Sequence, residues 1–191
     1  MEEQGQSSAE PPEPSGRSSM GPVGTPPHTT EPSQGLSIDL IGESSRVHPE
    51  DRARIAAALH RALGELGARG ELRVRLVNDA EMVRQHGERL GEFSTTDALT
   101  FDLSDGSAGD RVLDADVLVC VDEAIRRSGE RGIEVWRELT LYALHGALHC
   151  LDHDDKTEDA AARMHAEEDR LLELAGVGAV YAVGERGGAA R

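Results

Sequence analysis

The sequence predicts an α/β (α+β) protein: a single domain in which a mixed four-stranded sheet is packed with helices. Two observations predict this fold class. Four short segments have the alternating or continuous aliphatic pattern of strands, and helix-spaced segments lie around them in the order strand, helix, strand, helix, strand, strand, helix, helix, helix. In addition, one long segment in the second half is apolar on most helical faces, which is typical of a central, buried helix.

Composition at the two ends sets the domain limits. Residues 1–34 are mostly Glu, Pro, Ser, Gly, Gln and Thr, and such a segment buries too little apolar area to offset its ordering entropy. Residues 178–191 are rich in Gly and Ala. We therefore expect a disordered tail over 1–34, one folded domain over 35–177, and a flexible C-terminal tail over 178–191.

The first half of the domain alternates between strand and helix patterns. Residues 36–41 alternate like a half-buried strand, and Pro49 then opens a helix that Gly67 and Gly70 end. Residues 72–77 alternate again and predict a second strand.

A short helix follows, which Asp79 caps and which runs through Val83. Residues 98–103 predict the third strand, and Asp105-Gly106 predicts a turn. The end of the aliphatic segment 112–121 predicts a buried fourth strand over 117–121.

Three helices complete the domain. Asp122 is expected to cap a helix over 123–127, and Gly129 and Gly132 separate it from a helix over 134–151. This second helix is the apolar, central one. A last helix is expected over 157–174, with Met164, Leu171 and Leu174 facing inward.

Charge and composition restrict the function classes. The net charge of −16 disfavours a wide surface that coats nucleic acid, but not a focused site where a metal or an Arg cluster supplies positive charge. The two cysteines, Cys120 and Cys150, lie among apolar residues and are predicted to be buried, reduced thiols. The sequence has neither a membrane-spanning apolar run nor a signal peptide pattern, so we expect a cytoplasmic protein.

The segment 145–155, HGALHCLDHDD, carries the chemistry. His145 and His149 are four residues apart, which places both imidazoles on one face of the central helix. Zinc prefers a tetrahedron of ligands, and such a pair supplies two of its corners. His153, Asp154 and Asp155 are within reach as the third ligand, which leaves the fourth corner for water. The alternative is a hydrogen-bonded structural pair of histidines.

Gly146 excludes one familiar metal motif. The His-Glu-x-x-His proteases need a Glu directly after the first His as general base, and Gly stands there in this chain. Glycine inside a helix lowers stability. A close approach of backbone or substrate would explain it.

This segment resembles the YbeY-type endoribonucleases, also called rRNA maturation factors, whose motif is His-Gly-x-Leu-His-x-x-Gly-x-Asp-His. The matching residues are His145, Gly146, Leu148, His149 and Asp154. A second family block, Thr-Asp-Val-Leu-Ser-Phe, is similar to residues 96–101, TDALTF. The resemblance covers about residues 36–176.

The resemblance implies a single-strand-specific, metal-dependent endoribonuclease acting in rRNA maturation and ribosome quality control. It implies ribosomal RNA and ribosomal particles as partners, with no membrane and no DNA expected, and three protein ligands on one Zn²⁺. The metal ligands would be His145, His149 and Asp155, and the catalytic residues His145, His149 and Asp154, with Asp154 orienting a ligand.

The sequence departs from the family pattern at three positions. The third family His falls on Asp155, where a carboxylate oxygen is still a competent zinc ligand; His153, and less so His165, are the alternatives. The family Gly falls on Asp152, which tolerates the left-handed conformation less well. The family Arg thought to engage the substrate falls on Leu90, with Arg84 and Arg89 nearby.

Several other polar residues admit two interpretations. Thr96 and Asp97 form either a turn or part of the metal cleft. Arg137 and Glu138 could line the same cleft, but a surface pair in the first turn of the helix is the favoured interpretation. The run 167–169 and His165 are expected on the surface, and Asp114 and Asp116 are expected to be loop or strand-face acids.

The prediction from sequence is therefore a zinc endoribonuclease. A non-catalytic ribosome-assembly factor with a structural metal is the alternative, favoured by Leu90 and Asp155. A metal hydrolase of another substrate, such as a peptide, is disfavoured by Gly146.

Overall fold

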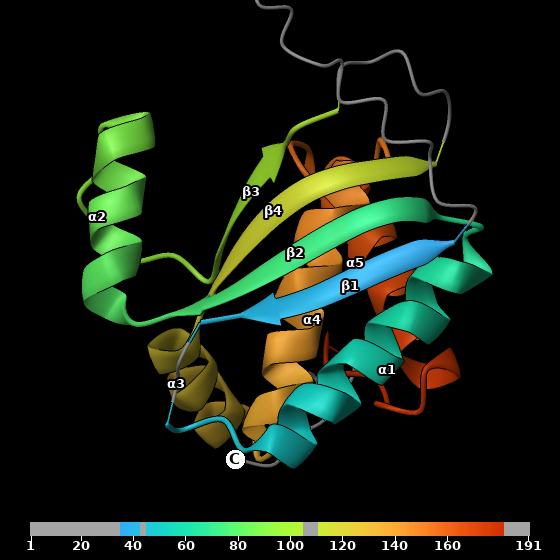
Figure 1. The fold of residues 1–191 in the computed structure, drawn as a ribbon, viewed down its shortest axis with the longest axis horizontal. Coiled ribbons are helices and arrows are strands. Elements are labelled where there is room, and N and C mark those ends of the chain that lie inside the picture. The colour runs from blue at the N-terminus through green and yellow to red at the C-terminus, as the bar shows by residue number, and fades with distance from the viewer. Residues whose placement is uncertain (1–34, 43–44, 105–110, 182–191) are drawn as a thin grey trace, which may run out of the picture. The chain divides into compact units, whose positions relative to one another are not determined.

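The computed structural model describes residues 35–42, 45–104 and 111–181, which form a four-stranded sheet and five helices (Figure 1). In chain order the elements are β1 (Leu36–Ile41), α1 (Pro49–Glu65), β2 (Arg69–Val77), α2 (Asp79–Leu90), β3 (Ala98–Asp102), β4 (Val112–Cys120), α3 (Val121–Arg131), α4 (Val135–His149) and α5 (Glu158–Leu174). The predicted order of strands and helices is confirmed. The expected tail over 1–34 and turn at 105–106 lie outside the described residues.

The sheet is mixed, as predicted. Its strand order is β1-β2-β4-β3, with β1, β2 and β4 parallel and β3 antiparallel to β4. Thr100 of β3 lies opposite Val117 of β4. Helix α1 connects the parallel strands β1 and β2, and α4, which follows the last strand, packs beside α1 on the same face of the sheet.

Alternation along the strands separates two apolar clusters. Val74, Val117 and Val119 belong to the large core, which α1, α4 and α5 cover; Figure 1 shows α4 crossing behind the sheet. The next residues along β4, Leu118 and Cys120, point to the opposite face and belong to a smaller cluster with α2. Among the described residues, no helix is long and apolar enough to cross a membrane.

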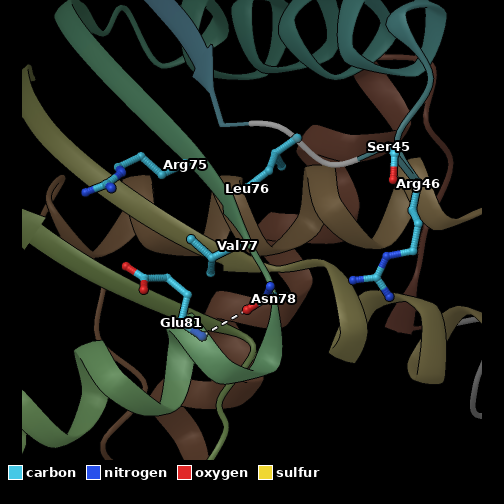
Figure 2. Close-up of a pocket in the computed structure, with 7 residues that line it drawn as sticks. All are labelled: Ser45, Arg46, Arg75, Leu76, Val77, Asn78 and Glu81. Carbon is cyan, nitrogen blue, oxygen red and sulfur yellow. Dashed lines mark hydrogen bonds between the residues drawn. The ribbon is translucent and has the colours of Figure 1, made fainter.

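The caps of α2 and α3 differ from the prediction. Asn78, not Asp79, caps α2, because its side chain accepts the Glu81 N–H at 2.9 Å (Figure 2). Asp122 does not cap α3 with its side chain; its carboxylate accepts the N–H of Asp79 at 2.8 Å. The aspartate that begins each helix thus binds a neighbouring element, a contact that local sequence does not reveal.

Gly70 was predicted to end α1, but it lies within β2. Its φ is +106°, and a Cβ there would be 2.1 Å from the carbonyl oxygen of Leu113. The strand therefore begins earlier than the pattern at 72–77 predicts, because glycine lets β2 continue where β4 approaches too closely for a side chain.

The chain after α5 packs back onto the domain. The Asp169 carboxylate accepts the N–H groups of Val180 and Tyr181 at 2.7 and 3.1 Å, and Val180 is fully buried. Residues 180 and 181 are therefore held against the domain by α5.

Candidate metal centre

The last turns of α4 carry the two histidines. Helix α4 is buried along most of its length, as predicted, and only its C-terminal end reaches the surface with imidazoles. The Nε2 atoms of His145 and His149 face each other at 3.1 Å, and the rings are nearly perpendicular. The four-residue spacing thus places both ring nitrogens at one point.

The turn after α4 brings in the third group. His153 N–H bonds to the Leu148 carbonyl at 3.0 Å, and Asp152 has a φ of 65°, the left-handed conformation that commonly ends a helix. The chain then reverses, and the Asp155 Oδ2 atom lies 3.9 Å from His145 Nε2 and 3.8 Å from His149 Nε2. His145, His149 and Asp155 form a group that could hold a metal ion.

The distances fit a metal of the zinc type. A point equidistant from three atoms with these separations lies about 2.1 Å from each, which is the usual length of Zn–N and Zn–O bonds. The hydrogen bonds fit as well. The Nδ1 atom of His149 lies 3.1 Å from the His153 carbonyl oxygen, which can only accept, so in the neutral ring Nδ1 carries the proton. The Nε2 lone pair of His149 then points into the cluster.

Glu168 fixes the other histidine in the same way. This side chain of α5 is fully buried, and its carboxylate lies 2.8 Å from His145 Nδ1. An ionised carboxylate only accepts, so the His145 Nε2 lone pair also faces the cluster. Two lone pairs 3.1 Å apart cannot bond to each other, and a cation between them satisfies both.

The prediction of a solvated face over 167–169 is therefore wrong for Glu168. Met164, Glu168 and Leu171 follow the spacing of one helical face, and the outer two are buried. That spacing was the signal that could have identified Glu168 from sequence. A glutamate on the apolar stripe of a helix needs a buried partner, and His145 is that partner.

Electrostatics at His145 result from opposing effects. Burial lowers its pKa, whereas the hydrogen bond to Glu168 and the charges of Glu168, Asp97 and Asp155 raise it, and the net shift of the pKa is upward. The site is thus rich in negative charge, which suits a divalent cation.

Gly146 makes a close backbone approach, one of the two explanations that the sequence left open. A Cβ at this position would lie 2.6 Å from Thr100 Oγ1 and 2.7 Å from Val117 Cγ1. The turn of α4 that carries both histidines is therefore pressed directly against β3 and β4.

The alternative ligands do not join the cluster. The backbone carbonyl of His153 accepts a hydrogen bond from His149 Nδ1, and the His153 ring is outside the cluster. His165 stacks on Tyr181 with ring centroids 4.0 Å apart. The carboxylate of Asp154 is half-exposed and accepts the Lys156 N–H at 3.2 Å, which holds the turn before Asp155.

Two other pairs of polar residues have defined partners in the structure. The Asp97 carboxylate accepts the N–H of Ala98 at 2.8 Å and the hydroxyl of Thr96 at 3.0 Å, so this block is a turn, and the charge of Asp97 helps to raise the pKa of His145. The predicted surface pair Arg137 and Glu138 is wrong, because Glu138 is fully buried. Its carboxylate accepts from Arg131 Nη1, and Arg137 donates to the Ala179 carbonyl.

Asp114 and Asp116 are strand-face acids, as predicted. Both carboxylates accept from the guanidinium of Arg73, on the sheet face opposite α4. Cys120 is buried, Cys150 is half-buried, and both are free thiols.

A separate pocket of about 400 Å³ lies at the end of β2, lined by Ser45, Arg46, Arg75, Leu76, Val77, Asn78 and Glu81 (Figure 2). Arg46 is paired with Asp122, and Figure 2 shows Arg46 and Arg75 at opposite sides of the pocket. None of its lining residues belongs to the metal cluster.

The fold and the site together define an α+β protein in which two histidines and one carboxylate, at the surface end of a buried helix, form a cluster that could hold a metal ion. This donor set is typical of hydrolytic metal sites, in which three protein ligands leave a position for water. Residues 42–176 match the family model described as Endoribonuclease YbeY, and the chain belongs to this family.

Relatives support the assignment along most of the chain. A protein named Endoribonuclease YbeY from Bacillus licheniformis is 31% identical over 153 residues, covering 74% of this chain and 96% of the relative. One of the same name from Geobacter sulfurreducens is 33% identical over 144 residues, covering 73% and 95%. The solution structure of a Thermotoga maritima protein shares the fold, with a TM-score of 0.54 and 20% identity over 72% of this chain and 88% of that one.

Proposed function

We propose that this protein is a metal-dependent endoribonuclease that cleaves single-stranded regions of ribosomal RNA during rRNA maturation and ribosome quality control. The observation that carries the proposal is the convergence of His145, His149 and Asp155 in a chain whose relatives are named endoribonucleases. The proposed metal is one Zn²⁺ per chain, because nitrogen and carboxylate donors at these separations suit zinc.

When bound, the metal would lower the pKa of a water molecule and stabilise negative charge on a phosphodiester. The residues of the chain do the rest. His145 and His149 present their Nε2 atoms, and Asp155 supplies the third donor. Glu168 and the His153 carbonyl keep the proton of each ring on Nδ1.

Asp154 has an indirect role in this proposal. Its hydrogen bond to the Lys156 N–H stabilises the turn that aims Asp155 at the two histidines. Asp154 would thus orient a ligand through the backbone.

The cluster also explains how a strongly acidic chain could bind RNA. A chain with a net charge of −16 repels RNA over most of its surface, so binding would be confined to the neighbourhood of the cation and nearby arginines. This confinement suits cleavage of exposed single strands at one point. The proposed place of action is the cytoplasm, on ribosomal particles.

A second candidate is a non-catalytic assembly factor in which the metal has a structural role. It is favoured by Leu90, which stands where the family carries an Arg thought to engage the substrate. It predicts metal binding without RNA cleavage.

The test combines elemental analysis with cleavage of ribosomal RNA by purified protein. We expect about one zinc per chain, lost in His149→Ala and Asp155→Ala and kept in His153→Ala, whose ring is outside the cluster. Cleavage should follow the metal across these variants. Metal binding without cleavage would favour the assembly factor, and a wild-type protein that takes up no offered zinc would refute the metal mechanism.

A further inference from the structure

A polar pocket of about 670 Å³ lies between α3, α4 and the residues that lead into β3. Its lining residues are Thr95, Thr96, Asp97, Glu123, Arg127, Arg131, Leu141, Tyr142 and Tyr181. Leu141, which lines the pocket, lies one turn before His145 on the same face of α4. The pocket is therefore next to the proposed site of cleavage, and its volume is in the range of small-ligand sites.

Arg131 is held rigidly at the wall of this pocket. Its Nη1 atom donates to both carboxylate oxygens of the buried Glu138, at 2.6 and 2.8 Å, and its guanidinium lies over the Tyr181 ring at 5.3 Å. Tyr181 is itself stacked on His165. Within the part of the chain that the structure describes, Nε and Nη2 of Arg131 have no hydrogen-bond partner, so this pocket-lining guanidinium has donors left for a ligand.

Asp97 supplies a fixed acceptor. Its Oδ1 atom is oriented by the Thr96 hydroxyl and the Ala98 N–H, and its backbone carbonyl accepts the Cys120 N–H at 2.8 Å. Among the described residues, Oδ2 of Asp97 accepts no hydrogen bond. No ion pair joins Asp97 to Arg131 in that part of the chain, so the two groups are separate features of the wall.

The remaining charges of the pocket are already engaged. Glu123 accepts from both Arg126 and Arg127, and Arg127 also pairs with Glu130. The arginines and acids of the lining are equal in number, so the pocket has no surplus positive charge to hold a phosphate. It has one donor edge and one acceptor edge to offer, which suits a nucleobase.

We propose that this pocket is a guanine subsite of the RNA-binding cleft, in which Arg131 donates to O6 and N7 and Asp97 accepts from N1–H and N2–H. Arginine commonly binds this guanine edge with two hydrogen bonds. Guanine carries two acceptors on one edge and two donors on another, so it can bridge two groups that do not touch each other. The proposal rests on the proposed function, because the guanine would lie beside the phosphodiester that is cut. Bases of unpaired RNA are accessible for such contacts.

The test uses metal-free protein, so that it does not depend on cleavage. Guanosine, adenosine, cytidine and uridine 5′-monophosphates are titrated into ¹⁵N-labelled protein, with ribose 5-phosphate as a phosphate control. We expect the guanine nucleotide to bind at least about ten-fold more tightly than the other three, with resonance shifts at the pocket.

Two variants and one control connect this preference to the proposed groups. Arg131→Lys keeps the positive charge beside Glu138 but loses the planar guanidinium that can donate two parallel hydrogen bonds. Asp97→Asn replaces the exposed carboxylate with an amide, which keeps one acceptor oxygen but puts a donor NH2 group in place of the other. Each should reduce the preference for guanine by roughly ten-fold. Arg170→Gln, which removes a surface arginine paired with Glu167, should leave the preference unchanged.

Equal binding of the four nucleotides, equal competition by ribose 5-phosphate, or a preference that survives both variants would overturn the proposal. Guanine preference in a protein that cleaves no RNA would support the subsite while refuting the nuclease. Cleavage of RNA without any base preference would support the nuclease while refuting the guanine subsite.

Discussion

Glu168 and His145 are joined by a hydrogen bond of 2.8 Å between a fully buried carboxylate and the Nδ1 atom of the ring. This contact makes α5 part of the candidate metal centre, although α5 supplies none of its three candidate ligands. It fixes which nitrogen of His145 is available and where that nitrogen points.

Glu168→Gln should therefore weaken zinc binding by roughly ten- to a hundred-fold, because an amide holds the ring proton on Nδ1 less firmly than a carboxylate. Competition with a chromogenic chelator measures the affinity. Glu167→Gln is the matched control, since Glu167 is paired with the exposed Arg170. Equal affinities in the two variants would contradict a positioning role for Glu168.

Gly146→Ala should destabilise the protein by about 1–3 kcal/mol, because the new methyl group would overlap Thr100 and Val117 and force α4 off the sheet. Urea unfolding followed by circular dichroism measures the loss. Gly129→Ala on α3 is the control, because nothing lies within 4 Å of a Cβ there. A Gly146→Ala protein as stable as the wild type would show that the close packing is relaxed in solution.

Asp152→Gly should stabilise the metal-free protein by about 0.5 kcal/mol, because Asp152 has a φ of 65°, which glycine adopts without steric cost. Thermal unfolding measures the change. Lys156→Gly provides the comparison: this exposed residue of the same loop has an ordinary φ, so glycine there should only add flexibility to the unfolded chain and slightly lower stability. Similar effects of the two substitutions would argue against strain at Asp152.

The two thiols should react slowly with alkylating agents in the folded protein. Burial raises the pKa of Cys120 to about 11 and that of Cys150 to about 11, so at pH 8 almost no reactive thiolate is present. Mass spectrometry after iodoacetamide treatment, with and without denaturant, counts the modified residues. Rapid labelling of Cys120 at pH 8 without denaturant would be inconsistent with its complete burial.

The strands, the central helix and the histidine pair were predictable because each depends on local periodicity. Residues 36–41 alternate, and α4 is apolar on most faces beyond its first turns, apart from His145 and His149. The buried-helix prediction in turn made the histidines conspicuous, since imidazoles on such a helix need partners.

The errors concern side chains whose partners are distant in sequence. Asp122 resembles a helix cap, but its carboxylate binds the backbone of Asp79 in another helix. Glu138 and Glu168 each occur beside other charged residues, which predicts exposure, yet each is buried against one partner from a different element. Tertiary contacts decide these cases, and single-sequence patterns do not contain them.

The order of the elements along the chain has a consequence for biosynthesis. All four strands of the described sheet end by Cys120, whereas the three proposed ligands and Glu168 lie between residues 145 and 168. A chain emerging from the ribosome therefore presents its whole sheet sequence before the first ligand is translated, and it gains the last member of the centre with α5. Cation capture would follow translation of the whole sheet, which delays the proposed capacity of a nascent polypeptide to act on RNA until α5 has been made.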